Sequence, residues 1–232
     1  MSVLPVIPVR WDVTPAEARS AQAELVPAVR LCPLAHPPRL VAGADTSYDR
    51  GSNRVTGAVV VWDTRTEQLV ERRTAVVETP FPYVPGLLAY REAPALMPAF
   101  AALSVQPDVI ALNGHGIAHP RRIGLATHLG LVFGLPAIGI AQNLLCGNHG
   151  PVGPEPGDTA ELTLNGAQVG YAVRTRARSN PIYVSPGHRI TVADALGLIL
   201  ATTRGYKLPV MIREAHLLSN QVRRQAAASH IA

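Results

Sequence analysis

The order of its apolar segments is the feature that most constrains how this chain can fold. Three β-rich runs come first, at residues 40–48, 56–63 and 68–78, and polar turns at 49–53 and 64–67 separate them. Strand-like and helix-like patterns then alternate along the rest of the chain. A strand meander followed by such alternation is the order of a mixed sheet with helices on its faces. We therefore predict an α/β fold with a mixed central β-sheet flanked by helices.

The remaining elements follow from unbroken apolar runs, which favour buried strands, and from capping and breaking residues. Thr14, Pro15 and Glu17 provide a helix cap, a first-turn proline and an acidic first turn. Pro94 suits the first turn of its helix, whereas Pro98 is expected to kink it. The further expected strands are 107–113, 136–145, 168–174 and 181–185, and the expected helices are 12–30, 88–103, one that ends near Leu131, 191–203 and 211–227.

Length and hydropathy limit the kind of protein. The 232 residues suit one α/β core, and no linker-like tract divides them, so residues 1–232 are expected to form a single domain. The longest apolar stretch, residues 131–141, is broken by Gly134 and Pro136, and it is too short to span a bilayer. Residues 1–10 lack a leading positive cluster, so we expect a cytoplasmic protein with no membrane partner.

Cysteine content and charge give weaker guidance. Cys32 and Cys146 are too few for a disulfide framework and lack metal-ligand spacing, so both are expected to be buried thiols. The net charge is +5 and the sequence pI is about 9.7. Such an excess of cations can hold a polyanion through its phosphates, which favours nucleic acid as a partner without establishing it.

Oxygen-bearing side chains at three places could hold a divalent cation. Asp45 and Asn113 each end an apolar run, and Glu92 follows a proline-rich loop. Mg²⁺ prefers oxygen ligands and is usually held by one or two carboxylates together with substrate phosphate. Each acid also has an ordinary structural explanation: Asp45 could cap a turn, and Glu92 could stabilise the first turn of a helix.

Histidines offer further candidates. His115 and His119 have a zinc-like spacing, but the glycine between them argues against the regular helix that such a pair needs. His119 with Arg121 and Arg122 could hold phosphate, and His216 could orient a metal-bound water. Each could equally be an ordinary surface or hydrogen-bonded polar residue.

Several long motifs, in the same order over most of the chain, resemble those of the endonuclease V family, deoxyinosine 3′ endonucleases with an RNase H-like fold. The matching segments are 41–45, 82–92, 108–121, 139–142, 184–189 and 213–216. The resemblance implies a DNA repair nuclease that uses Mg²⁺, or Mn²⁺ in its place. It would recognise deoxyinosine in DNA and cleave the second phosphodiester bond 3′ to it. RNA stays open as a substrate, and we expect a monomer.

The resemblance also assigns residues to roles. It implies a metal centre of Asp45, Glu92 and Asn113, with Gln142 and His216 as further catalytic positions. The substrate-binding positions that it implies are Pro82, Tyr83, Val84, Pro85, Gly86, Leu88, Gly114, His119 and Arg121. Within this set, residues 82–85 match a wedge that separates the strands at the lesion, and its tyrosine can replace lost base stacking. The glycines match positions where a missing side chain admits the flipped base.

Two positions depart from the family pattern. The third metal-site acid is Asn113, and a lysine expected beside the site is Gln142. An amide oxygen brings no charge, and a unit charge about 4 Å away is worth up to about 4 kcal/mol at an effective dielectric of 20. The missing lysine removes a cation that could stabilise the transferring phosphate. We therefore expect reduced activity. Two alternatives stay open: a catalytically silent protein that binds inosine or other nucleic acid, and a recruited metabolic enzyme that uses the same pocket on a small molecule.

Overall fold

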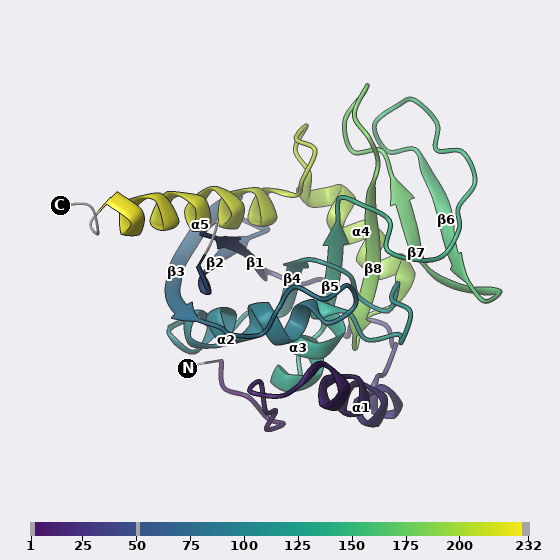
Figure 1. The fold of residues 1–232 in the computed structure, drawn as a ribbon. Helices are drawn as coiled ribbons and strands as arrows, with labels where there is room; N and C mark the ends of the chain where they lie inside the picture. Colours follow the sequence, from purple (N-terminus) through teal and green to yellow (C-terminus); the bar gives the residue numbers. More distant parts are fainter. Residues whose placement is uncertain (1–2, 50–51, 229–232) are drawn as a thin grey trace.

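The computed structural model describes residues 3–49 and 52–228 and contains one eight-stranded mixed sheet (Figure 1). The strand order is β3-β2-β1-β4-β5-β8-β7-β6. Strands β1, β4 and β5 run parallel, and every other neighbouring pair is antiparallel. The strands are β1 (Leu40–Tyr48), β2 (Arg54–Asp63), β3 (Gln68–Glu78), β4 (Val109–Asn113), β5 (Ala137–Ala141), β6 (Thr159–Leu164), β7 (Ala167–Val173) and β8 (Ile182–His188). The predicted mixed central sheet is confirmed.

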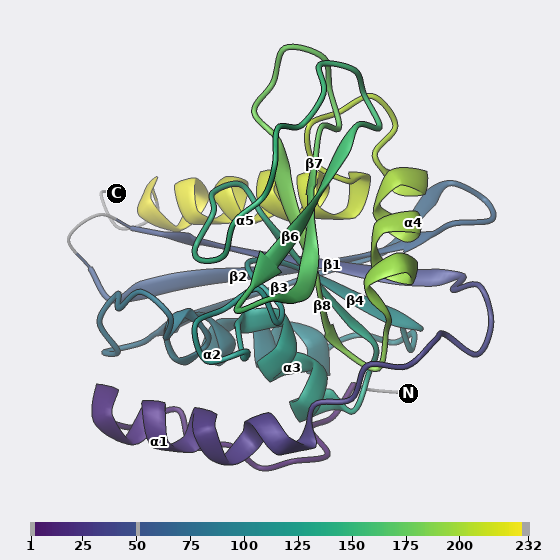
Figure 2. The ribbon, with the colours of Figure 1, turned by 90° about the vertical axis from the view of Figure 1, so that its right-hand side faces the viewer.

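Helices cover both faces of this sheet (Figures 1 and 2). Helices α2 and α3 share a buried core with one face, and α4 and α5 share a second core with the other. Helix α1 lies outside the layer that α2 and α3 form (Figure 2). The helices are α1 (Pro15–Leu25), the 3₁₀ turn η1 (Val26–Ala28), α2 (Leu88–Ala101), α3 (Leu125–Phe133), α4 (Val192–Thr202) and α5 (Val210–Ala228).

The first helix begins as predicted and ends earlier. The Thr14 side chain accepts a hydrogen bond from the backbone N–H of Glu17, and the Glu17 carboxylate accepts one from the backbone N–H of Thr14. The α-helix ends at Leu25 because Pro27 has no N–H to donate and its ring opposes a further α-helical turn. Gln22, a polar residue, is buried on the inner face of α1, whereas Leu25 is only half-buried.

Other boundaries also differ from the predictions. Helix α2 continues through Pro94 and Pro98, and Pro94 lies beyond its first turn. Strand β5 ends at Ala141 instead of 145, and β6 is an additional strand that was not among the predicted elements. The predicted turn at 49–53 lies partly outside the described residues.

The two cysteines do not form part of the core. Cys32 is exposed and Cys146 is half-buried, so the expectation of two buried thiols is wrong. Both residues lie in irregular segments, one after η1 and one after β5, outside the two large buried cores. Within the described residues, no helix is long and apolar enough to cross a membrane.

Two glycines let helices approach the β1–β2 pair closely from opposite faces. A Cβ atom at Gly43 would lie 2.4 Å from backbone atoms of Met211 in α5. A Cβ atom at Gly57 would lie 2.4 Å from the carbonyl oxygen of Ala95 in α2. Because Gly57 pairs with Thr46, both close contacts lie near Asp45.

Candidate active site

Asp45 and Asn113 meet at neighbouring parallel strands. Ala44 of β1 pairs with Leu112 of β4, so the next residue of each strand lies beside the other. The Asn113 Nδ2 donates a hydrogen bond of 2.8 Å to Asp45 Oδ1. A carboxylate can only accept, so the amide nitrogen of Asn113, and not its carbonyl oxygen, faces Asp45.

His216 reaches the same carboxylate from helix α5. Its Nδ1 lies 2.7 Å from Asp45 Oδ2, and this hydrogen bond raises the pKa of His216 because it stabilises the imidazolium. Side chains alternate along a strand, so Val41, Gly43 and Asp45 share the face that α5 covers. The close approach of α5 at Gly43 therefore places His216 within reach of Asp45.

Glu92 approaches the centre from helix α2 on the other face. It is 6% exposed, and its Oε1 accepts a hydrogen bond from the Tyr48 hydroxyl at the end of β1. Burial, together with the charge of the nearby Asp45 carboxylate, raises the pKa of Glu92 to about 8. Glu92 therefore holds a proton at neutral pH unless positive charge enters the centre.

The donor atoms of this centre fit a hard divalent cation. Asp45 contacts Asn113 directly and acts on Glu92 through its charge. The described residues include no cluster of three or more His, Cys, Asp and Glu side chains that could hold a metal, and one of the three oxygen donors of this centre is the amide of Asn113. Two buried carboxylates and one amide oxygen are nevertheless ligands that Mg²⁺ prefers. A cation at this centre would stabilise the ionised form of Glu92, which burial disfavours.

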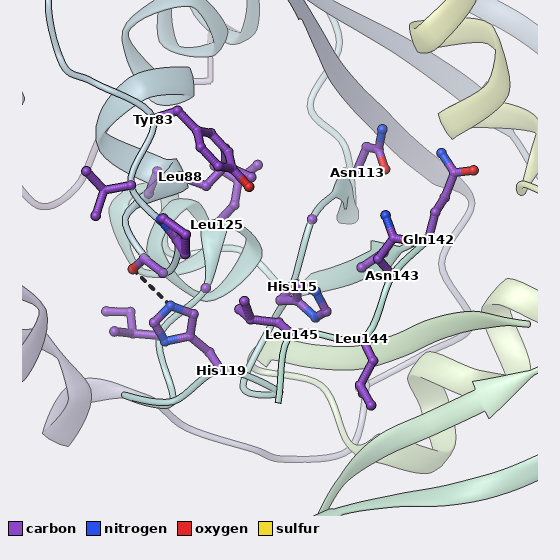
Figure 3. A pocket seen from close by; sticks show the side chains of 18 of the residues that line it. Tyr83, Leu88, Asn113, His115, His119, Leu125, Gln142, Asn143, Leu144 and Leu145 are labelled. Atoms are coloured by element: carbon purple, nitrogen blue, oxygen red, sulfur yellow. Dashed lines mark hydrogen bonds between the residues drawn. The ribbon is translucent and has the colours of Figure 1, made fainter. Parts of the chain in front are cut away.

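A pocket of about 350 Å³ adjoins this centre (Figure 3). Tyr83 stands at its mouth and is 69% exposed. Asn113 and Gln142 line the pocket as well, so the pocket and the oxygen-donor centre share a wall. Of the positions predicted to bind substrate, the pocket is lined by Tyr83, Val84, Pro85, Gly86, Leu88, Gly114 and His119; Pro82 and Arg121 are not lining residues.

His119 and Arg121 support the wall of the pocket at Gly86. The Gly86 carbonyl oxygen accepts hydrogen bonds from Gln22 Nε2 at 3.1 Å, His119 Nε2 at 2.9 Å and Arg121 Nη2 at 2.7 Å. Burial lowers the pKa of His119 to about 4, so its ring is neutral at pH 7. His119 Nδ1 accepts from the Arg121 N–H, which leaves the hydrogen on Nε2 for Gly86. In this arrangement both side chains support the loop that ends at Gly86.

Three residues that contact the site were not predicted from the sequence. Tyr48 bonds Glu92, Gln22 bonds Gly86, and Lys207 Nζ lies 3.4 Å from Gln142 Oε1. A signal existed for Gln22, because a polar residue on the inner face of an amphipathic helix needs a buried partner. No sequence signal indicated Tyr48 or Lys207.

Comparisons with known proteins agree with this architecture. The sequence profile of the family described as Endonuclease V matches residues 23–217. Endonuclease V of Myxococcus xanthus is 47% identical over 219 residues, which cover 93% of this chain and 92% of that protein. The crystal structure of endonuclease V from Streptomyces avermitilis superposes with a TM-score of 0.88 at 41% identity, covering 98% of this chain and 100% of that chain.

A more distant solved structure shares the fold at 24% identity. It is endonuclease V of Ciona intestinalis in complex with a 24mer DNA that contains an inosine followed by a ribo-adenosine. The TM-score is 0.77, and the alignment covers 91% of this chain and 98% of that one.

The sheet order and helix layers are those of the RNase H-like fold that endonuclease V structures have, and the predicted fold is confirmed. The chain belongs to the endonuclease V family of nucleases.

Proposed function

We propose that this protein is a Mg²⁺-dependent endonuclease, with Mn²⁺ as an alternative ion, that recognises deoxyinosine in DNA. It cleaves the second phosphodiester bond 3′ to the lesion. The observation that carries the proposal is the shared wall: Asn113 and Gln142 line the pocket, and Asn113 also bonds Asp45 in the oxygen-donor centre. A base held in the pocket would thus leave its strand beside that centre. The inosine-containing DNA bound by the Ciona protein is in keeping with this substrate.

The centre divides the chemistry among a few side chains. Asp45, Glu92 and Asn113 would hold the ion, which when bound stabilises charge on the phosphate and lowers the pKa of an attacking water. His216 is oriented by its hydrogen bond to Asp45, and its Nε2 is free of that bond and can move a proton. Tyr83 is exposed on a loop whose base is fixed at Gly86, which suits a residue that stacks where a base has left.

Turnover is expected to be lower than with an acid at position 113. Asn113 brings no charge, and its amide nitrogen must turn away from Asp45 before its oxygen can face an ion. The loss of one unit charge about 4 Å away corresponds to at most about 4 kcal/mol at an effective dielectric of 20. Ion binding and turnover are therefore expected to fall together.

A nicking assay tests the proposal. The substrate is a duplex with a single deoxyinosine, with an undamaged duplex and an inosine-containing RNA as parallel substrates, each incubated with Mg²⁺ or Mn²⁺. We expect slow, inosine-dependent nicking by the parent and faster nicking by Asn113→Asp and by Asn113→Asp/Gln142→Lys. If neither the parent nor the double variant nicks the inosine duplex, the proposal is wrong.

One observation favours a second function, lesion binding without cleavage. The Asp45 carboxylate already has two hydrogen-bond partners, Asn113 and His216, so the centre is satisfied without an ion. This alternative predicts that the parent binds inosine-containing strands selectively and does not cut them. If Tyr83→Ala leaves the affinity for inosine-containing and ordinary strands equal to those of the parent, Tyr83 has no recognition role and the alternative fails.

A further inference from the structure

The only lysine of the chain lies at the mouth of the candidate active site. Lys207 stands in the segment between α4 and α5, among 21 Lys and Arg residues that are otherwise all arginine. Its Nζ is 3.4 Å from Gln142 Oε1. Gln142 follows the end of β5 directly and lines the pocket together with Asn113 (Figure 3). A single ammonium group is thus placed beside the wall that the pocket and the centre share.

The backbone around Lys207 is fixed on both sides. Its carbonyl oxygen accepts a 2.6 Å hydrogen bond from the Thr175 hydroxyl. The preceding residue, Tyr206, donates its N–H to the Thr203 carbonyl and lies 4.3 Å beneath the Arg213 guanidinium. The following residue, Leu208, packs against the core that α4 and α5 cover. Only the flexible lysine side chain is therefore left to adjust when an anion arrives.

Three arginines near the site are engaged elsewhere. Arg121 bonds the Gly86 carbonyl, Arg91 bonds the Phe81 carbonyl, and Arg213 pairs with Glu214. For Lys207, by contrast, the described residues provide the neutral amide oxygen of Gln142 and no carboxylate within ion-pair distance. A cation that faces a neutral partner at the rim of a pocket keeps its charge available for a ligand.

We propose that Lys207 is a phosphate-binding residue of this site, whose ammonium contacts the backbone of the strand that enters the pocket, with Gln142 positioning it. The inference rests on the proposed function, since it presumes a nucleic-acid strand in the pocket. A lysine suits the task because its ammonium is a compact charge on a flexible stem and can follow one phosphate oxygen. The charge that position 142 lacks is thereby supplied from the α4–α5 segment.

Binding of an inosine-containing strand in EDTA tests the proposal without any ion. Lys207→Gln is expected to weaken binding about tenfold and to reduce the salt dependence by about one phosphate contact. The charge-swapped variant Gln142→Lys/Lys207→Gln is expected to recover most of the affinity. Arg72→Gln is the matched control, because it removes one exposed positive charge from the edge strand β3. Unchanged affinity and salt dependence in Lys207→Gln, or an equal loss in Arg72→Gln, would overturn the assignment.

The single lysine permits a second, independent measurement on the parent protein. An amine-acylating reagent modifies Lys207 and the N-terminal amine, and mass spectrometry of peptides separates the two. We expect an inosine-containing strand to protect Lys207 and to leave the N-terminal amine reactive. Equal reactivity of Lys207 with and without the strand would contradict the proposal. If Asn113→Asp nicks inosine duplexes while Lys207 shows neither protection nor a binding effect, the proposed function stands and the role of Lys207 falls.

Discussion

Asn113 changes the centre in two ways that act together. It removes a negative charge next to Asp45, and it gives Asp45 a hydrogen-bond donor. With aspartate at this position, two carboxylates would face each other at hydrogen-bond distance, and only a cation or a proton could relieve their repulsion. We therefore expect the amide to stabilise the ion-free protein and to lower its affinity for an ion.

Asn113→Asp is expected to lower the stability of the ion-free protein and to raise its affinity for an ion. In EDTA the variant should unfold at a lower temperature than the parent, because of like-charge repulsion with Asp45. Saturating Mg²⁺ should raise its unfolding temperature more than that of the parent, since an ion that binds only the folded state stabilises it. Thermal unfolding across a Mg²⁺ titration measures both effects, and Asn113→Ala is the control for loss of the amide. Equal Mg²⁺ shifts in all three proteins would show that position 113 has no contact with an ion.

Glu92→Gln is expected to stabilise the ion-free protein. The folded pKa of Glu92, about 8, lies above the ordinary value of 4.5. When the pKa of a carboxyl group is higher in the folded state than in the unfolded state, stability is lost as the pH rises from 4.5 through 8. The reason is that the unfolded state releases its proton first. The variant should gain about 4 kcal/mol in the free energy of unfolding at pH 8 and little at pH 5. Urea unfolding in EDTA at the two pH values measures this, and a gain of the same size at both would contradict it.

Part of the candidate site could be predicted from the sequence, and the rest could not, for a physical reason. The resemblance picked out Asp45, Asn113 and His216, which the structure brings into one hydrogen-bonded group. Tyr48 and Lys207 escaped notice because their partners are distant in sequence and no local pattern encodes such contacts. Their roles depend on which strands become neighbours, which only the folded sheet determines.

Helices α2 and α5 reach the centre because glycines remove side chains between layers. Packing of a helix on a sheet normally keeps side chains between the two backbones. At Gly43 and Gly57 the helix backbone itself takes their place, 2.4 Å from where a Cβ atom would be. His216 and Glu92 are thereby held close to β1 from its two sides.

Gly43→Ala is expected to separate α5 from β1. The added methyl group would overlap backbone atoms of Met211, which cannot rotate away as a side chain could. We expect a loss of about 1–3 kcal/mol in the free energy of unfolding and a weaker Asp45–His216 hydrogen bond. The second effect is measurable as a lower pKa of His216 by NMR titration. Gly150→Ala, where a Cβ atom meets nothing within 4 Å, is the matched control. A His216 pKa equal to that of the parent would refute this account.

Most elements could be predicted from the sequence, and each strand that was missed or misplaced has a physical explanation. The bounds of β1 and β3 agree with their apolar runs. Strand β6 lies at the edge of the sheet and buries only Leu162 fully. Its six residues do alternate polar and apolar side chains, as half-buried strands do, but the run is short and the prediction missed it. The run that was expected to extend β5 to residue 145 instead leaves the sheet at Gln142 and lines the pocket.

Acid sensitivity belongs to the molecule as a whole, because buried imidazoles are spread over it. Burial lowers the pKa to about 4 for four histidines: His115, His119, His128 and His188. For these groups the unfolded state binds protons first as pH falls, so stability is lost between about pH 6.5 and pH 4. The protein is therefore expected to unfold cooperatively in mild acid.

His128→Phe is expected to reduce this acid sensitivity. His128 is fully buried in α3 against Trp11 and Tyr90, and neither ring nitrogen has a hydrogen-bond partner among the described residues. Phenylalanine keeps the aromatic packing and cannot bind a proton. The variant should retain on the order of 2 kcal/mol more stability than the parent at pH 4.5, with a smaller difference at pH 7.5. Urea unfolding at both pH values measures this, and parallel pH profiles would disprove it.

The three donors on the Gly86 carbonyl have a mechanical consequence. A loop anchored by Gln22, His119 and Arg121 cannot swing as a lid without breaking all three hydrogen bonds at once. The wall of the pocket at Gly86 therefore has its shape before a ligand arrives, and a ligand must fit that shape.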